Sequence, residues 1–110
     1  MTGRVCLYRW DELPLEVVTE LISRKTIAGA RERLAQVYLK KGALVPVHAH
    51  GGPELIYVLE GALSARLGPR MSDAAVTVRD GDVLRLPAGV PHQFEALDDT
   101  FVFDVKTEEA

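Results

Sequence analysis

The sequence predicts an all-β fold, a closed or two-sheet antiparallel barrel, and three observations support that prediction. Short runs of β-forming residues follow one another along most of the chain. Turn signals separate these runs about every 8 to 12 residues, a spacing typical of sandwiches and barrels. Only residues 11–22 have an apolar spacing that a helix could use. With 110 residues, the chain has the size of one domain, which can bury a core without disulfides or a structural metal.

The first half of the chain is expected to contain one short helical turn and two strands. Pro14 and two adjacent β-branched valines disfavour a long helix. We therefore expect at most one helical turn, near residues 13–17. The next β-rich runs are residues 17–29 and 31–42, and they follow each other closely. This spacing predicts a hairpin around the sequence AGAR.

The second half is expected to form short strands separated by glycine and proline turns. Residues 54–68 are rich in β-forming residues and are interrupted at Gly61. The sequences GPRMSD and RDGD are turn signals. The sequence PAGVPH cannot continue a strand, because proline lacks the backbone donor. The further strands expected here cover residues 74–78, 83–87, 93–97 and 100–106.

Charge and composition argue against several classes of function. The formal charge of −3, from 16 acidic and 13 basic residues, provides neither a basic field for nucleic acid nor a polybasic patch for membranes. No apolar run reaches the roughly 18 residues of a membrane span, and the N-terminus lacks the apolar region of a signal peptide. Cys6 is the single cysteine and cannot form an internal disulfide. We therefore expect a soluble cytoplasmic protein.

The three histidines of the chain lie in two short segments. His48 and His50 are two residues apart, so on a strand they share one face and could converge on a metal ion. Glu54 follows after a GGP sequence that can bend the chain back toward the same ion. His92 follows a proline-glycine corner. His48 and His50 could also be surface residues that are neighbours by chance. His92 could be a hydrogen-bonded or exposed residue with no metal.

The spacing around these histidines resembles the two sequence motifs of the cupin family. Residues 42–61 match the first motif and residues 81–96 match the second. Ala96 departs from the pattern, since the second motif usually ends in asparagine, a residue that is not a metal ligand in the family. The matching positions are Gly42, His48, His50, Glu54 and Gly61, then Gly81, Pro87, Gly89 and His92.

The resemblance implies a single-domain cupin jelly-roll β-barrel over residues 1–110. It also implies one divalent transition metal inside the barrel, held by His48, His50, Glu54 and His92. Such a mixed imidazole and carboxylate set suits iron, manganese, nickel, zinc or copper. Four protein ligands leave exchangeable positions on the ion, as in a catalytic or ligand-binding site.

The last predicted strand carries an acidic residue that could face the metal. Val102 and Asp104 share one strand face, and Phe101 and Phe103 share the other. Asp104 is either a solvated edge residue or part of the pocket wall. The segment resembles that of small cupins which open unsaturated uronates, where an aspartate on the last strand reaches the pocket. Those proteins tend to have glutamine, one residue farther on, where this chain has Glu54. On this resemblance Asp104 is the candidate catalytic residue.

Several other positions have two interpretations. On residues 33–40, either Gln36 and Tyr38 or the alternate face with Val37 could line the pocket. Arg66 and Arg85 could bind an acidic ligand or lie at the surface. The N-terminal segment, residues 1–16, is apolar and aromatic around Tyr8 and Trp10 and is expected to cover the barrel or form an interface, which predicts a homodimer.

The sequence thus supports two hypotheses of function. The first is a metal-dependent enzyme, a lyase, isomerase or oxygenase, that acts on a small oxygenated acid or a sugar-derived substrate. The second is a small-ligand-binding or sensing module without turnover. The metal ligand set is common to both, since fold and site do not name a substrate.

Overall fold

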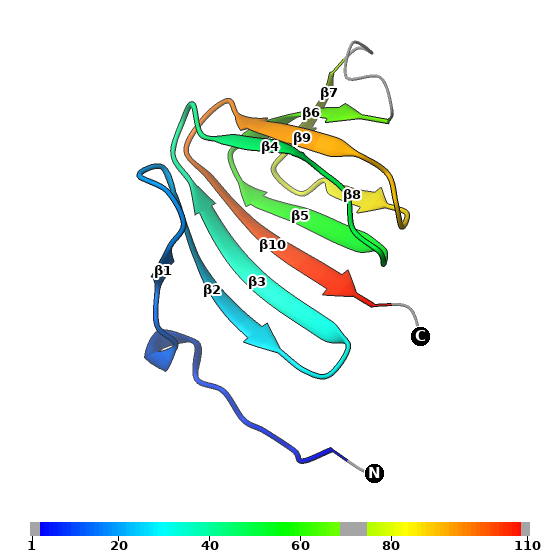
Figure 1. Ribbon diagram of the computed structural model, residues 1–110. Coiled ribbons are helices and arrows are strands. Elements are labelled where there is room, and N and C mark those ends of the chain that lie inside the picture. Colours follow the sequence, from blue (N-terminus) through cyan, green and yellow to red (C-terminus); the bar gives the residue numbers. More distant parts are fainter. Residues whose placement is uncertain (1–2, 69–74, 109–110) are drawn as a thin grey trace.

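The computed structural model describes residues 3–68 and 75–108, which form two antiparallel sheets facing each other (Figure 1). One sheet has the strand order β1-β2-β3-β10-β5-β8 and the other has the order β4-β9-β6-β7. The all-β fold is therefore confirmed. The elements are η1 (Trp10–Glu12), β1 (Glu16–Val17), β2 (Ile22–Ala28), β3 (Glu32–Leu39), β4 (Leu44–His48), β5 (Glu54–Glu60), β6 (Ala62–Leu67), β7 (Val76–Arg79), β8 (Val83–Leu86), β9 (His92–Ala96) and β10 (Thr100–Thr107).

The last strand of the chain lies in the middle of the larger sheet. β10 pairs with β3 on one side and β5 on the other, so the end of the chain is inserted between two earlier strands (Figure 1). The register places Lys106 opposite Glu54 and Asp104 opposite Ile56. In the smaller sheet, β4 pairs with β9 and places His48 opposite His92. These two pairings bring the candidate residues of both motifs into the space between the sheets.

Gly61 is the point where the chain passes from one sheet to the other. β5 belongs to the larger sheet and β6 to the smaller one, with this residue between them. Its φ is +97°, and a Cβ there would lie 2.5 Å from the Asp99 backbone oxygen and 2.5 Å from Thr100 Oγ1. Only glycine fits both the backbone angle and the close approach. The interruption predicted at this position is thus a crossing between the two sheets.

Two details near the N-terminus differ from the expectation. The helical turn lies at Trp10–Glu12, not at residues 13–17, because Pro14 keeps the residue before it extended, with φ −72° and ψ 138°. The strand predicted over residues 17–29 is two strands, since β1 and β2 form a hairpin in which the Val18 N–H donates to the Ile22 carbonyl. In the described residues, no helix is both long and apolar enough to cross a membrane.

The other predicted turns are found where the described residues include them. β2 and β3 form the hairpin expected around AGAR, with Ala28 opposite Arg33. The RDGD turn joins β7 to β8. The predicted GPRMSD turn falls almost entirely within residues 69–74, outside the described residues.

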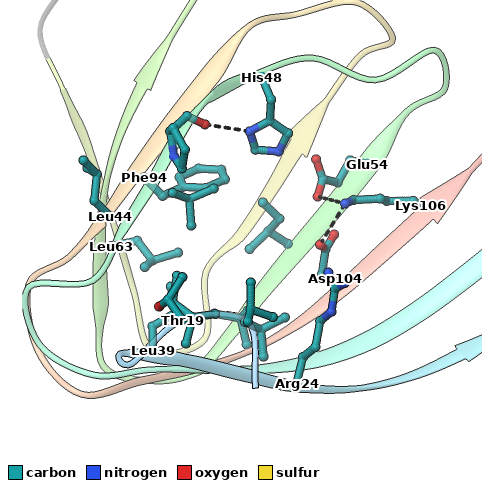
Figure 2. A pocket seen from close by; sticks show the side chains of 17 residues that line it. Thr19, Arg24, Leu39, Leu44, His48, Glu54, Leu63, Phe94, Asp104 and Lys106 are labelled. Carbon is teal, nitrogen blue, oxygen red and sulfur yellow. Dashed lines mark hydrogen bonds and ion pairs between the residues drawn. The ribbon is translucent and has the colours of Figure 1, made fainter. Parts of the chain in front are cut away.

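The inner faces of the two sheets enclose a cavity of about 210 Å³ (Figure 2). Alternation along the strands decides which side chains face it. Val37 on β3 and both Val102 and Asp104 on β10 line the cavity. Gln36 and Tyr38 lie on the outer face, where the Tyr38 ring stacks on Phe101 with centroids 4.6 Å apart. Of the two alternatives for residues 33–40, the structure therefore supports the face that carries Val37.

Candidate metal centre

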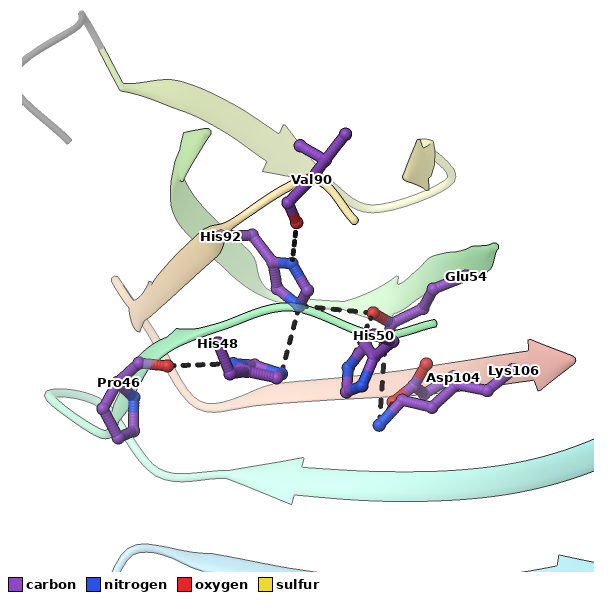
Figure 3. Close-up of polar contacts among 8 residues, drawn as sticks. All are labelled: Pro46, His48, His50, Glu54, Val90, His92, Asp104 and Lys106. Carbon is purple, nitrogen blue, oxygen red and sulfur yellow. Dashed lines mark hydrogen bonds and ion pairs between the residues drawn. The ribbon is translucent and has the colours of Figure 1, made fainter. Parts of the chain in front are cut away.

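Three histidines converge in the space between the sheets (Figure 3). His48 ends β4, His50 follows just after it, and His92 begins β9. The Nε2 atoms of His48 and His92 are 3.0 Å apart, and each of the three rings offers a nitrogen within 4.8 Å of the others. His92 is buried, and the other two are half-buried. The structure thus brings together the histidines that the sequence pattern singled out.

Two backbone contacts hold the segment that carries His50. The Gly89 N–H donates to the His50 carbonyl at 2.8 Å, which joins the first motif to the second. Gly52 lies directly against the end of β10, and a Cβ there would meet the Thr107 carbonyl oxygen at 1.6 Å. The GGP sequence therefore bends the chain as expected, because glycine allows this close approach.

Glu54 joins the histidines from the first position of β5. Its side chain is 3% exposed, and Oε1 lies 3.4 Å from His50 Nε2 and 3.3 Å from His92 Nε2. Two ligand atoms bound to one transition-metal ion at 2.0–2.2 Å lie roughly 3 to 3.5 Å apart. The observed separations between these side chains have that size.

Hydrogen bonds to the backbone fix the tautomers of two of the rings. His48 Nδ1 lies 2.9 Å from the Pro46 carbonyl oxygen, and His92 Nδ1 lies 3.0 Å from the Val90 carbonyl oxygen. A carbonyl oxygen only accepts, so in the neutral rings each Nδ1 carries the hydrogen and each Nε2 presents a lone pair. Two lone pairs then face each other across 3.0 Å. Such an arrangement fits a cation between the rings, with the carbonyls orienting the ligands.

Two further polar atoms in the same place lack a hydrogen-bond partner among the described residues. They are His50 Nε2 and Glu54 Oε1, and both are buried; Asp104 Oδ1 on the neighbouring strand also lacks a partner. Leaving a buried polar atom unpaired is costly. A divalent ion bound by the three imidazoles and the carboxylate would satisfy both atoms and the facing lone pairs at once. The residues present therefore fit a metal ion of the kind that the sequence predicts.

The charges beside the histidines come from β5 and β10. Lys106 Nζ lies 3.8 Å from Glu54 Oε2 and 3.6 Å from Asp104 Oδ2 (Figure 3). Burial alone would raise the pKa of Glu54, but contacts with His92 and Asp104 lower it well below its usual range. Burial and the neighbouring Glu54 carboxylate raise the pKa of Asp104. Glu54 is therefore the ionised member of the pair, and Asp104 is the one that holds a proton.

The same surroundings shift the histidines in opposite directions. Burial and the Lys106 charge lower the pKa of His50. Burial would also lower the pKa of His92, but its contact with Glu54 raises it. The lowered pKa of His50 favours the neutral ring that can bind a metal, whereas the raised pKa of His92 favours the protonated ring that cannot.

Of the other polar residues considered from the sequence, only Asp104 lines the cavity. Arg66 and Arg85 are exposed, and neither is among the described residues that line it. The cations at the cavity are instead Arg24 and Lys106. Strand alternation could have indicated Lys106, because it lies two residues after Asp104 on the same face. Arg24 lies opposite Val37 in the β2–β3 hairpin, and it had no such signal because the sequence left open which face of residues 33–40 lines the pocket.

Trp10 packs on the outer face of the larger sheet. Its ring meets Phe103 edge-to-face at 6.1 Å, and its indole N–H donates to the Gln36 side chain. Lys25 Nζ donates to the Trp10 carbonyl at 3.0 Å. Trp10 therefore covers part of the larger sheet, which is one of the two roles expected for the N-terminal segment. It does not line the cavity.

Comparisons with known proteins agree with the fold. A family model described as the cupin domain matches residues 35–105. A comparison with curated proteins finds no match.

Solved structures of similar fold cover nearly the whole chain. KdgF from Halomonas sp. superposes with a TM-score of 0.81 at 24% identity, over 97% of this chain and 96% of that one. An RmlC-like cupin from Shewanella frigidimarina superposes with a TM-score of 0.84 at 18% identity, over 99% of this chain and 96% of that one. A Bacillus subtilis oxalate decarboxylase with Mn(II) centres gives 0.81 at 18%, over 97% of this chain but 31% of its own. At these identities the likeness shows the jelly-roll fold.

Proposed function

The chain belongs to the cupin domain family, and from this premise we propose that it is a metal-dependent enzyme acting on a small oxygenated acid or a sugar-derived substrate. One observation carries the proposal. Unpaired imidazole and carboxylate atoms gather at one end of a cavity between the sheets. His48, His50, His92 and Glu54 would hold the ion. When bound, a divalent ion supplies a Lewis acid that polarises a carbonyl or hydroxyl oxygen.

The chain itself would bind the substrate and move a proton. Asp104 lies on the cavity wall, and its side chain is 16% exposed. A carboxyl group within hydrogen-bond reach of a substrate carbon or hydroxyl can act as a general acid or base, worth about 10²–10⁴ in rate. The lyase and isomerase reactions need this proton transfer, whereas an oxygenase would depend more on the ion. The Asp104 position therefore favours a lyase or an isomerase.

Metal content tests the first half of the proposal. Purified protein should contain about one divalent transition metal per chain, since the four side chains make one site. His48→Ala should lose most of it, because the ring contributes one of the facing lone pairs. Arg85→Ala, a change of an exposed side chain on β8, is the control and should keep the parent's content. Equal metal content in the parent and His48→Ala would contradict the assignment.

Turnover tests the second half. Metal-loaded protein should be assayed on unsaturated uronates, then on keto acids, with oxygen consumption followed. Asp104→Asn should keep the metal and lose most of any activity found. A variant with parental metal and parental turnover would remove Asp104 from the mechanism.

A binding module without turnover is the second candidate. The largely apolar cavity wall favours it, because apart from the ligand set few groups there could take part in chemistry. If no substrate class reacts while small acids still bind the metal-loaded protein, this candidate replaces the enzyme.

We also propose that the protein is a homodimer. Val5 and Leu7 are 102% and 80% exposed, and the segment that carries them extends away from the sheets (Figure 1). The outer face of the larger sheet adds exposed apolar side chains, among them Tyr57 and Val83. Exposed apolar surface of this kind is typical of an interaction site. A second copy of the chain could cover both features at once.

A further inference from the structure

The cavity beside the metal centre is divided into a charged side and an apolar side. Figure 2 shows Arg24, Asp104 and Lys106 along one side and Leu44, Leu63 and Phe94 along the other. Eleven of the 17 side chains that line it are apolar. The polar groups other than the metal ligands come mainly from β2 and β10. A ligand in this cavity therefore meets charge at one end and hydrocarbon over most of its surface.

We propose that the cavity binds a small carboxylic acid with an apolar body, aromatic or branched aliphatic, and that Lys106 recognises its carboxylate. The inference deepens the proposed function and rests on it in two respects: the ligand site is the cavity at the metal centre, and a bound ion contributes to the positive charge there. It narrows the substrate class from oxygenated or sugar-derived acids to acids whose body carries few hydroxyl groups.

The apolar wall is the first argument. A hydroxyl group gives up hydrogen bonds to water when it enters the cavity, and it regains none from a hydrocarbon wall. A sugar acid carries a hydroxyl on most of its carbons, so most of its polar groups would face side chains such as Val37, Phe94 and Val102. An aromatic ring or branched chain gains free energy from the same contacts.

The balance of charge is the second argument. Arg24 is held in a two-point ion pair with Glu16, at 3.1 and 3.0 Å, so its charge is largely compensated. Lys106 faces Glu54 and Asp104. A bound divalent ion and Lys106 together carry three positive charges at this end of the cavity. The carboxylates there, Glu54 and Asp104, carry at most two negative charges. At least one positive charge therefore remains in excess, which suits a carboxylate ligand.

The size of the cavity is the third argument. Its volume of about 210 Å³ is below the roughly 300–1,000 Å³ of sites for drug-sized ligands. The space suits one ring or a short branched chain together with the carboxylate. Longer sugar chains would have to lie outside it.

Calorimetric binding to metal-loaded protein tests the proposal, with metal content measured on every sample. The probes are phenylacetate, benzyl alcohol and galacturonate. Phenylacetate should bind at least about tenfold more tightly than either of the others, because it alone offers both the carboxylate and the apolar body. Galacturonate binding as tightly as phenylacetate, or no binding of either acid, would overturn the proposal.

Two sets of variants assign the two ends of the ligand. Lys106→Met should weaken phenylacetate binding about tenfold and leave benzyl alcohol unchanged, whereas Lys40→Met, an exposed lysine, should change neither. Val37→Phe should fill the cavity and abolish binding, and Val37→Ala at the same position should not. Unchanged phenylacetate affinity in Lys106→Met would overturn the role of Lys106.

The metal measurement separates this inference from the proposed function. Protein that lacks metal after loading contradicts the metal-dependent function, and the preference for phenylacetate over galacturonate still tests the apolar wall of the cavity in that protein. Protein that holds metal but prefers galacturonate contradicts only the inference that the ligand has an apolar body.

Discussion

At the residue scale, His92 is the side chain that joins the others. It is 1% exposed, lies opposite His48 in the β4–β9 register, and reaches both His48 Nε2 and Glu54 Oε1. Its Nδ1 is occupied by the Val90 carbonyl, which leaves Nε2 for a metal. The His48 and His92 rings are thus oriented by backbone carbonyls, which turn their Nε2 atoms toward each other.

The first prediction concerns Asp104 in the metal-free protein. Burial and then Glu54 raise its pKa above the unfolded value of about 3.9. An acidic group whose pKa is raised in the folded protein contributes stability below its unfolded pKa. This contribution is lost as the pH rises through the folded pKa. Asp104→Asn removes this ionisation. The variant should therefore gain about 1 kcal/mol or more over the parent at about pH 9, and little at about pH 4.

Urea unfolding in the presence of a chelator measures this difference. Asp11→Asn, at an exposed position of η1, is the control and should follow the parent at both pH values. A stability difference that does not grow with pH would contradict the raised pKa of Asp104.

The candidate site was predictable at this scale where spacing carries the information. The positions of His48, His50 and His92 follow from strand alternation and motif spacing, and the structure brings them together. Lys106 was missed although it shares the strand face of Asp104. Arg24 could not be placed, because it lies opposite Val37 in the β2–β3 hairpin and the inner face of residues 33–40 was left open.

At the element scale, the bend between β4 and β5 positions two parts of the site. His50 precedes the bend and Glu54 follows it. Gly52 allows this bend by lying against the Thr107 backbone at the end of β10. The bend and the end of β10 are thus packed together beside the candidate ligand atoms.

The second prediction is that Gly52→Ala disrupts the site. A Cβ would lie 1.6 Å from the Thr107 carbonyl oxygen and 2.7 Å from its carbon, so backbone must move. We expect a loss of about 1–3 kcal/mol in the free energy of unfolding and weaker metal binding, because the shift moves His50 or Glu54. Thermal unfolding and metal titration measure both effects.

Gly51→Ala is the matched control for this change. A Cβ at Gly51 meets nothing within 4 Å among the described residues, so the variant should stay within about 0.5 kcal/mol of the parent. Equal behaviour of the two variants would contradict the role given to Gly52.

The strands were predictable from turn signals, but two features of the elements were not. The expected helical turn moved to Trp10–Glu12, since Pro14 excludes its preceding residue from a helix. β1 and β2 are separated by a turn at residues 18–21. Apolar residues lie on both sides of this turn, so the sequence pattern does not mark the division between the two strands. Tertiary pairing, and not local propensity, decides that boundary.

At the scale of the whole molecule, strands from the two ends of the chain meet in one sheet. β10 pairs with β3 and β5, and this long-range pairing sets Asp104 and Lys106 beside the first motif. The assignment of β5 and β6 to different sheets could not be derived from turn spacing, because a turn of one residue looks the same within a sheet and between sheets. The family resemblance supplied that part of the fold.

The third prediction is a dimer at micromolar concentration. The exposed outer face of the larger sheet and the N-terminal segment would bury apolar surface against a second copy. Tyr57→Lys places a charge on that face and should shift the protein toward monomer. Light scattering measures the mass, and Thr77→Lys, on the exposed side of β7 in the other sheet, is the control. A monomer mass over the whole concentration range would reject the dimer.

The most direct test of the account is the position of the metal itself. A crystal structure recorded with anomalous scattering at the edges of manganese, iron, nickel, copper and zinc would locate and identify it. We predict one anomalous peak per chain, within about 2.0–2.2 Å of Nε2 of the three histidines and an oxygen of Glu54. A well-ordered structure with no peak among these side chains, or with a peak bound elsewhere on the protein, would contradict the claim that they form a metal centre.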